Sequence, residues 1–434
     1  MFFYSTRNQQ QPQSLSQAIL SGLATDGGLY LPEYFPQINL AELDPNLSYP
    51  QFAAKILSPF FAGDRLAPQL EEICQQAFNF PLVLRQLKPN TKILELFHGP
   101  TLSFKDFGAR FLAECLTRLS TERKTTIMVA TSGDTGSAVA SAFYHKDNIK
   151  VVVLFPQGQV SPRQQQQLTC WGDNILALAV KGNFDDCQKI VKQAFSDPWW
   201  QSSSHLSSAN SINIARLLAQ LTYYAYSSWQ AWLASGTTIG YVVPTGNLGN
   251  ATAAYWAKSM GFPLREIALA TNANRVIAEY LISGEYTPRA TIATLANAMD
   301  VGNPSNFERL SALFKTPALF NANVTATSVS DAQISATIQA AYHESNYILC
   351  PHTATAYFTR AHLSTQDWII VATADPCKFE MIIEPLIQTT LVVPAQLQSL
   401  LAKPAKVIEV AAELHQVQLA VESSARNYPQ AGGI

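Results

Sequence analysis

An α/β fold built on parallel sheets is the class that this sequence predicts, and three observations support it. A short β-rich run at 125–130 is followed by a helix-length segment at 137–144 and a second apolar run at 150–155. A further unit places a buried strand at 241–244 before a helix at 251–260. The turns inside both units are polar and contain glycine, which is typical of loops at the carboxyl ends of parallel strands.

Composition and charge narrow the classes of partner. The chain has 434 residues, 47% of them hydrophobic and 14% charged, which indicates a compact protein with large cores. A formal net charge of −2 gives no general attraction for nucleic acid or an anionic membrane. The longest apolar runs, such as 151–155 and 175–180, are far shorter than the ~20 residues of a membrane span. We expect neither nucleic-acid nor membrane partners, and the oligomeric state stays open.

The cysteines and the first residues predict a cytoplasmic protein. Residues 1–7 lack the charged and then apolar pattern of a secretion signal. The six cysteines have no paired spacing, which favours reduced and mostly buried thiols over disulfides or zinc ligands, so no metal site is expected. They stand at positions 74, 115, 170, 187, 350 and 377.

Residues 1–90 predict a separate N-terminal unit or a layer that caps the α/β part. This segment mixes short helical periodicity with loops rich in proline and glycine. Phe52, Ile56, Leu57 and Phe60 recur at helical spacing and are expected in the core rather than in a binding site.

A lysine stands in an unusual position within the stretch 95–112. A glycine–proline pair ends the preceding element, and apolar residues recur at helical spacing from Phe107 onward, so Lys105 falls in the first turn of a helix. Asp106 or Ser103 could cap that turn, but a positive charge is unfavourable there, which lowers the pKa of the lysine. Such a lysine can attack a carbonyl to form a Schiff base; the alternative is a surface lysine tolerated near a helix start.

Two polar turns are candidates for binding an anion. The turn 131–136 (TSGDTG) offers hydroxyl and N–H donors, although an ordinary connection between a strand and a helix has the same composition. In the turn 245–250 (TGNLGN), two glycines allow close approach and the following helix start supplies N–H groups, which suits a phosphate dianion. It lacks the P-loop lysine and the dinucleotide glycine spacing, so we expect the phosphate of some other molecule.

Two further segments end in polar side chains. Asn210 and Ser211 precede a long helix, and Arg216 one turn further could point with them at an anion. Simple helix capping and a solvated arginine would explain the same residues. The strand predicted at 367–372 ends in Thr373, which could present its hydroxyl to a ligand lying across the sheet.

Together these motifs resemble those of the threonine synthases, pyridoxal-phosphate enzymes of the tryptophan synthase β-like fold family, also called fold type II. The resemblance implies two α/β domains that flank the cofactor, at 93–230 and 231–434, behind an N-terminal domain at 1–92. It extends over nearly the whole chain, and the matching segments are 4–7, 22–32, 98–106, 131–136, 182–188, 210–216, 245–250, 298–310 and 350–353.

The resemblance also implies a role for each candidate residue. Lys105 would be the catalytic Schiff-base lysine, and Thr373 would face the pyridine nitrogen of pyridoxal 5'-phosphate. Asp134 departs from the Asn that many relatives in the wider fold family carry beside the cofactor's 3-hydroxyl. The other cofactor contacts would come from Gly246, Asn247, Leu248, Gly249 and Asn250, and the substrate contacts from Thr131, Ser132, Thr135, Asn210, Ser211 and Arg216.

The implied reaction converts O-phospho-L-homoserine and water to L-threonine and phosphate, the last step of threonine biosynthesis. Lys105 would remove the Cα proton, phosphate would leave from Cγ and water would add at Cβ. Two alternatives stay open. One is a related phospho-lyase that releases phosphate from the same substrate and yields a keto acid and ammonia. The other is a non-catalytic protein that keeps the pyridoxal-phosphate fold as a sensor.

Overall fold

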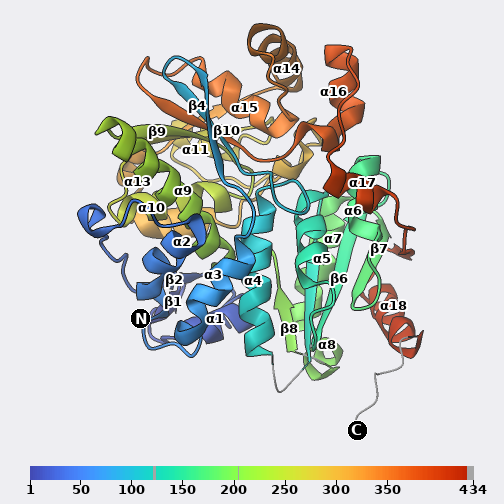
Figure 1. Ribbon diagram of the computed structural model, residues 1–434. Helices are drawn as coiled ribbons and strands as arrows, with labels where there is room; N and C mark the ends of the chain where they lie inside the picture. The colour runs from blue at the N-terminus through green and yellow to red at the C-terminus, as the bar shows by residue number, and fades with distance from the viewer. Residues whose placement is uncertain (121–123, 204, 428–434) are drawn as a thin grey trace.

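The computed structural model describes residues 1–120, 124–203 and 205–427, and it contains two large sheets covered by helices (Figure 1). The predicted α/β class is therefore confirmed. Helix α4 (Lys105–Leu119) runs through the middle of the molecule, between the N-terminal helices and α5 (Asp134–Phe143). Its buried face includes Phe107, Phe111 and Leu112, which are fully enclosed.

The N-terminal unit contains a short antiparallel pair of strands and three α-helices. β1 (Phe3–Ser5) pairs with β2 (Tyr30–Pro32). The side chains predicted for the core, Phe52 among them, are all fully buried, and the Phe52 ring stacks on Trp229 with centroids 5.0 Å apart. The helical segments are α1 (Leu15–Ser21), η1 (Leu40–Glu42), α2 (Tyr49–Leu57), η2 (Ser58–Phe61), η3 (Ala67–Gln69) and α3 (Leu70–Ala77).

One large sheet has five parallel strands in the order β13-β7-β6-β5-β8. β5 has the predicted bounds, and its register places Thr125 opposite Ile149 in β6. The strands are β5 (Thr125–Ala130), β6 (Ile149–Pro156), β7 (Ile175–Lys181), β8 (His205–Ser208) and β13 (Val407–Ala411). The helices near it are α6 (Pro162–Thr169), α7 (Phe184–Ser196), α8 (Pro198–Ser203), α17 (Ala395–Leu401) and α18 (Leu414–Asn427), together with α4 and α5.

The other sheet has six strands in the order β11-β10-β9-β12-β4-β3, all parallel except the β3–β4 hairpin. Its strands are β3 (Val83–Lys88), β4 (Thr91–Glu95), β9 (Ile239–Pro244), β10 (Leu264–Thr271), β11 (Thr325–Ser328) and β12 (Trp368–Ala372). Its helical segments are α9 (Ile214–Ser235), α10 (Gly249–Ser259), α11 (Val276–Ser283), η4 (Asn297–Met299), α12 (Phe307–Phe314), α13 (Pro317–Asn323), α14 (Asp331–Ser345), α15 (Pro351–Arg360), η5 (Pro376–Phe379) and α16 (Glu380–Ile387).

The two sheets exchange chain segments at two points. β3 and β4 precede α4 in the sequence but pair with the six-stranded sheet, where β4 lies beside β12. β13 comes near the end of the chain but pairs with β7 in the five-stranded sheet. The division into 1–92, 93–230 and 231–434 stays a prediction, and a linear division of this kind does not describe these two crossings.

The helix caps expected for two segments are wrong. α4 has Phe104 at its N-cap without a capping side chain, because the Asp106 carboxylate instead accepts hydrogen bonds from the N–H and hydroxyl of Thr101 (2.9 and 2.7 Å). Ser103 Oγ is buried without a partner among the described residues. The long helix α9 is capped by Asn213, whose side chain accepts from the N–H of Ala215, so neither Asn210 nor Ser211 is its cap.

Two expectations about the chain as a whole can be compared with the structure. The six cysteines are buried and free, as predicted. Among the helices described, none combines the length and the apolar character that crossing a bilayer requires.

Candidate active site

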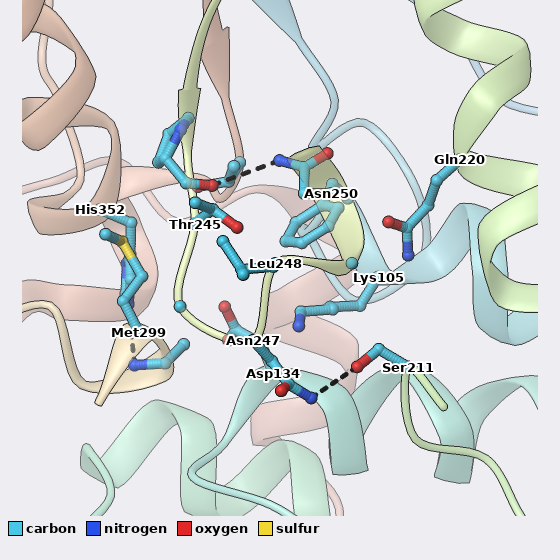
Figure 2. A pocket seen from close by; sticks show the side chains of 16 residues that line it. Lys105, Asp134, Ser211, Gln220, Thr245, Asn247, Leu248, Asn250, Met299 and His352 are labelled. Atoms are coloured by element: carbon cyan, nitrogen blue, oxygen red, sulfur yellow. Dashed lines mark hydrogen bonds between the residues drawn. The ribbon is translucent and has the colours of Figure 1, made fainter. Parts of the chain in front are cut away.

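A cavity lies where the carboxyl ends of strands from both sheets meet the start of α4 (Figure 2). All of the residues predicted to bind the cofactor line it, and so does Ser211 from the predicted substrate group. The lining residues are Phe104, Lys105, Asp134, Ser211, Gln220, Pro244, Thr245, Gly246, Asn247, Leu248, Gly249, Asn250, Ala298, Met299, His352 and Thr373.

Lys105 projects into this cavity from the first position of α4. Its Nζ lies 4.7 Å from the centroid of the Phe104 ring. Burial is the largest cause that lowers the pKa of Lys105, to about 8, and the positive charge of Arg216 acts in the same direction. The lowered pKa agrees with the sequence prediction, although burial rather than the helix start is its main cause. A substantial fraction of this amine is therefore neutral and nucleophilic near pH 8.

The turn 245–250 presents its main chain to the cavity while neighbours hold its side chains. The side-chain oxygen Oδ1 of Asn250 accepts hydrogen bonds from the hydroxyls of Tyr223 and Tyr224 (2.6 and 2.7 Å). Leu248 has φ +60°, and α10 begins at the next residue. The first N–H groups of a helix have no acceptor inside the helix, so this turn can donate several of them to an anion.

Contacts with Ser211, Ser305 and Met299 also hold this turn in place. Asn247 donates to Ser211 Oγ (2.7 Å) and accepts from the N–H of Ser305. A Cβ on Gly246 would lie 2.7 Å from the Cα of Met299, so only glycine fits there. The shape of the turn is thus fixed by hydrogen bonds of its side chains and by close packing on Met299.

Thr373 follows β12 directly and is tied to the segment that carries Lys105. Its carbonyl accepts the N–H of Phe104 (2.8 Å), and its own N–H donates to Thr353 Oγ1 (3.2 Å). Its hydroxyl is buried and has no partner within the described part of the chain. A buried hydroxyl of this kind requires a partner, and the residue lines the cavity, so a ligand can supply one.

Asp134 is held by two side chains that the sequence analysis did not identify. Lys378 Nζ lies 2.7 Å from Asp134 Oδ1, and Gln164 Nε2 donates to the same oxygen (2.9 Å). Burial alone would raise the pKa of Asp134, but the charge of Lys378 and these hydrogen bonds outweigh it and lower that pKa. The carboxylate is therefore ionised, and Oδ2 is the oxygen that neither partner occupies.

The predicted carboxylate-binding residues form the turn that begins α5. Thr131 Oγ1 accepts the N–H groups of Gly133 (3.0 Å) and Gly136 (2.9 Å), so this hydroxyl stabilises the turn itself. Ser132 and Thr135 are half-buried in the same turn. None of the three lines the cavity, and their role toward a substrate stays a prediction.

The residues predicted to bind a substrate phosphate lie along one loop and helix. Ser211 lines the cavity, whereas the Asn210 amide donates to the carbonyl of Ala130 (3.1 Å). Arg216 is 1% exposed, and its Nη1 donates to the carbonyl of Ala209. Its Nε is buried without a partner among the residues described. Arg216 is thus enclosed behind the cavity rather than solvated, and its role is also still a prediction.

His352 and Gln220 also line the cavity but were not predicted to bind. His352 Nε2 accepts the N–H of Ala298 (3.0 Å), which places the ring proton on Nδ1, and burial lowers its pKa to about 4. Gln220 stands four residues after Arg216 on α9, so helical spacing from Arg216 could have identified it. Lys378 follows Thr373 by five residues without any pattern that marks it.

Three family models match successive parts of the chain. The model described as pyridoxal-phosphate dependent enzyme matches residues 87–372. The model of the threonine synthase N terminus matches residues 2–78, and that of the threonine synthase C-terminal region matches residues 352–421. The first of them alone covers more than half of the chain.

Individual relatives agree with these models over nearly the full length. The threonine synthase of Haemophilus influenzae is 40% identical over 399 residues, which cover 92% of this chain and 94% of that protein. The crystal structure of threonine synthase from Escherichia coli has a TM-score of 0.92 and 38% identity, covering 98% of this chain and 100% of that one. Pyridoxal-phosphate-bound threonine synthase from Brucella melitensis has a TM-score of 0.90 and 34% identity, with 98% and 100% coverage. The chain belongs to the threonine synthases, a family of pyridoxal-phosphate-dependent enzymes.

Proposed function

We propose that the cavity binds pyridoxal phosphate at Lys105 and that the protein converts O-phospho-L-homoserine and water to L-threonine and phosphate. One observation supports this most strongly: Lys105, the turn 245–250 and the Thr373 hydroxyl line a single cavity, although they come from three separate parts of the chain. Membership of the threonine synthases supports the choice of substrate.

The donor set of the cavity fits the cofactor. Lys105 offers an amine with a lowered pKa for the aldehyde, and the start of α10 offers N–H groups for the phosphate. The Thr373 hydroxyl, buried and without a protein partner among the described residues, can donate to the ring nitrogen. When bound, pyridoxal phosphate supplies an electron sink for negative charge that develops at Cα of an amino acid.

Thr373 and Lys105 would direct that chemistry toward elimination. A neutral hydroxyl beside the ring nitrogen does not stabilise its protonated form as a carboxylate would, which favours elimination over transamination. Lys105 would remove the proton from Cα and serve as the base close to Cβ, since burial lowers its pKa to about 8. His352 is buried and neutral, so it would orient groups through Nδ1–H rather than exchange protons.

The substrate would be held by residues in and around the cavity. Ser211 Oγ reaches the cavity and, with the charge of Arg216 enclosed behind it, is suited to the substrate phosphate. Asn210 would support that loop through its bond to Ala130. Ser132 and Thr135, which flank Asp134 in the turn shaped by Thr131, would donate to the substrate carboxylate.

A further proposal concerns the cellular compartment of the protein and the class of molecule that it binds. The protein has six free, buried cysteine thiols, which are typical of proteins in a reducing compartment. We therefore place the protein in the cytoplasm. The formal net charge of −2 supports a small-molecule substrate rather than a nucleic-acid or membrane partner.

Product analysis tests the proposed reaction against its two alternatives. The reconstituted protein is incubated with O-phospho-L-homoserine, and amino acids, keto acids and phosphate are quantified by chromatography. We expect threonine and phosphate in equal amounts, and no turnover of homoserine, which lacks the phosphate. A keto acid with ammonia would indicate the phospho-lyase, and the absence of any turnover in the pyridoxal-phosphate-loaded protein would indicate a binding protein.

A further inference from the structure

The carboxylate that lines the cavity together with Lys105 already has another lysine as its partner. Asp134 lines the same cavity as Lys105, but its ion pair, 2.7 Å long, is with Lys378. The Lys378 side chain is fully buried, and Asp134 is 3% exposed. The ion pairs found among the described residues do not include Lys105, whose ammonium lies beside the Phe104 ring instead. Lys105, Lys378 and Asp134 are thus buried close together. The Asp134 carboxylate pairs with Lys378, which does not line the cavity.

The Asp134–Lys378 pair is held in place by hydrogen bonds with three neighbouring residues. Lys378 Nζ also donates to the carbonyl of Thr101 (2.8 Å), in the loop just before α4. Gln164 on α6 donates to the Asp134 oxygen that Lys378 contacts. The main chain of η5 is held at the start of the same helix, because Ser161, the N-cap residue of α6, donates its hydroxyl to the carbonyl of Lys378 (2.8 Å). Neither member of the pair can turn away without breaking several buried hydrogen bonds.

The charged groups around Lys105 come from four other elements. Arg216 on α9 and Lys378 on η5 are positive, Asp134 on α5 is negative, and His352 on α15 is neutral. Asp106 on α4 itself is buried and turned onto Thr101, from which it accepts two hydrogen bonds. The carboxylate of Asp134, on α5, is therefore the anion that stabilises the ammonium form of Lys105. The same carboxylate forms the ion pair with Lys378.

We propose that Lys378 is a positioning residue that keeps the Asp134 carboxylate occupied and so leaves the Lys105 amine free to react. Without Lys378, the carboxylate has Lys105 as its nearest cationic partner in the cavity, and a close opposite charge favours the protonated amine. The inference rests on the proposed role of Lys105 as the amine that binds the cofactor. It assigns to η5 a part in the reaction although Lys378 does not line the cavity.

The test is the pH dependence of cofactor capture by the apoprotein. Only a neutral amine adds to an aldehyde, so the rate of absorbance change on mixing with pyridoxal phosphate reports the protonation of that amine. Free pyridoxal phosphate also titrates, but it does so equally for every variant. We therefore compare variants by the difference between the midpoints of their rate–pH curves. In wild type we expect the rate to rise through a midpoint near pH 8, from the pKa of Lys105 of about 8. In Lys378→Met the midpoint rises by about 1 to 3 pH units, as for an amine that gains a carboxylate neighbour.

Two further variants distinguish this role from a merely structural one. Asp134→Asn leaves Lys378 unpaired and moves the midpoint below that of wild type, in the opposite direction to Lys378→Met. The double variant contains neither charge and returns the midpoint to within about half a pH unit of wild type, because a positive and a negative charge near Lys105 are removed together. Lys378→Arg keeps the positive charge and also stays near wild type. Asp134→Asn tests the same coupling if Lys378→Met does not fold.

The result that would overturn the inference is an unchanged midpoint in Lys378→Met, or a double variant displaced as far as Lys378→Met. A midpoint in Asp134→Asn that equals that of wild type would overturn it as well. A failure of the proposed function looks different: Lys105→Ala would then capture pyridoxal phosphate with the wild-type pH profile, which shows that another amine reacts. Thermal unfolding of each apoprotein verifies that the compared variants are folded.

Discussion

The turns 131–136 and 245–250 have similar sequences and positions, but they use their polar groups in opposite ways. Each follows a parallel strand at its carboxyl end and begins a helix. In the first turn, Thr131 Oγ1 accepts the N–H groups of Gly133 and Gly136, so the turn satisfies its own donors. Asp134 is the residue of this turn that lines the cavity, and Lys378 and Gln164 hold it.

The second turn is satisfied by its neighbours instead. Its six residues all line the cavity, while Asn250 is held by two tyrosines of α9 and Asn247 by Ser211 and Ser305. The main-chain N–H groups at the start of α10 therefore stay available to a ligand. The comparison indicates that the second turn keeps main-chain donors available for an anion because other elements, rather than its own hydroxyls, stabilise its shape.

The largest expected effect comes from a methyl group in the second turn. In Gly246→Ala the new Cβ would lie 2.7 Å from the Met299 main chain, which must move, whereas in Gly249→Ala it would lie 3.1 Å from the Ser211 side chain. We expect Gly246→Ala to weaken pyridoxal-phosphate binding by about 100-fold or more, roughly 3 kcal/mol, and Gly249→Ala by less than about tenfold. Titration of the two apoproteins with the cofactor measures this. Equal affinities would show that the close approach to Met299 is unimportant.

The next effect tests whether neighbours stabilise the second turn. Asn250→Ala removes the acceptor of the Tyr223 and Tyr224 hydroxyls, which are buried and then have no partner there. We expect the free energy of unfolding to fall by about 2–3 kcal/mol, measured by urea denaturation of the apoprotein. Tyr224→Phe removes one of the two bonds without leaving a polar group unsatisfied and should cost about 1 kcal/mol. If both variants lose the same amount, the tyrosines do not depend on Asn250.

The smallest effect concerns the first turn. Thr131→Val keeps the shape of the side chain but removes the acceptor of two buried N–H groups, so we expect unfolding free energy to fall by about 1–2 kcal/mol. Cofactor affinity should stay close to that of wild type, and Thr131→Ser, which keeps the hydroxyl, should be nearly as stable as wild type. A variant that keeps full stability but has a raised KM would assign Thr131 to the substrate rather than to its own turn.

The strands and the lysine-bearing helix could be predicted because their signals are local. β5 has the predicted bounds, since a β-rich run and a polar turn define it, and Lys105 stands at the start of α4, since a break and a helical period surround it. The expected cap failed for a different reason. Asp106 forms its hydrogen bonds with Thr101 in the preceding loop, and no local spacing distinguishes that arrangement from a cap.

The residues that sequence reasoning missed depend on contacts between distant segments. Lys378 reaches Asp134 across 244 positions of the sequence only because η5 packs on α6. The His352 tautomer depends on the N–H of Ala298, in η4, which precedes it by 54 positions. No local pattern gives the partners of these side chains, so their roles become visible only when both sheets are assembled.

The central claim is that Lys105, and not its buried neighbour Lys378, is the amine that holds the cofactor. Reduction of the reconstituted protein with sodium borohydride fixes pyridoxal phosphate covalently to the lysine that binds it, and peptide mass spectrometry identifies that lysine. We expect the phosphopyridoxyl group on Lys105, with an unmodified Lys378. A label on Lys378, or on lysines outside the cavity with none on Lys105, would contradict the account.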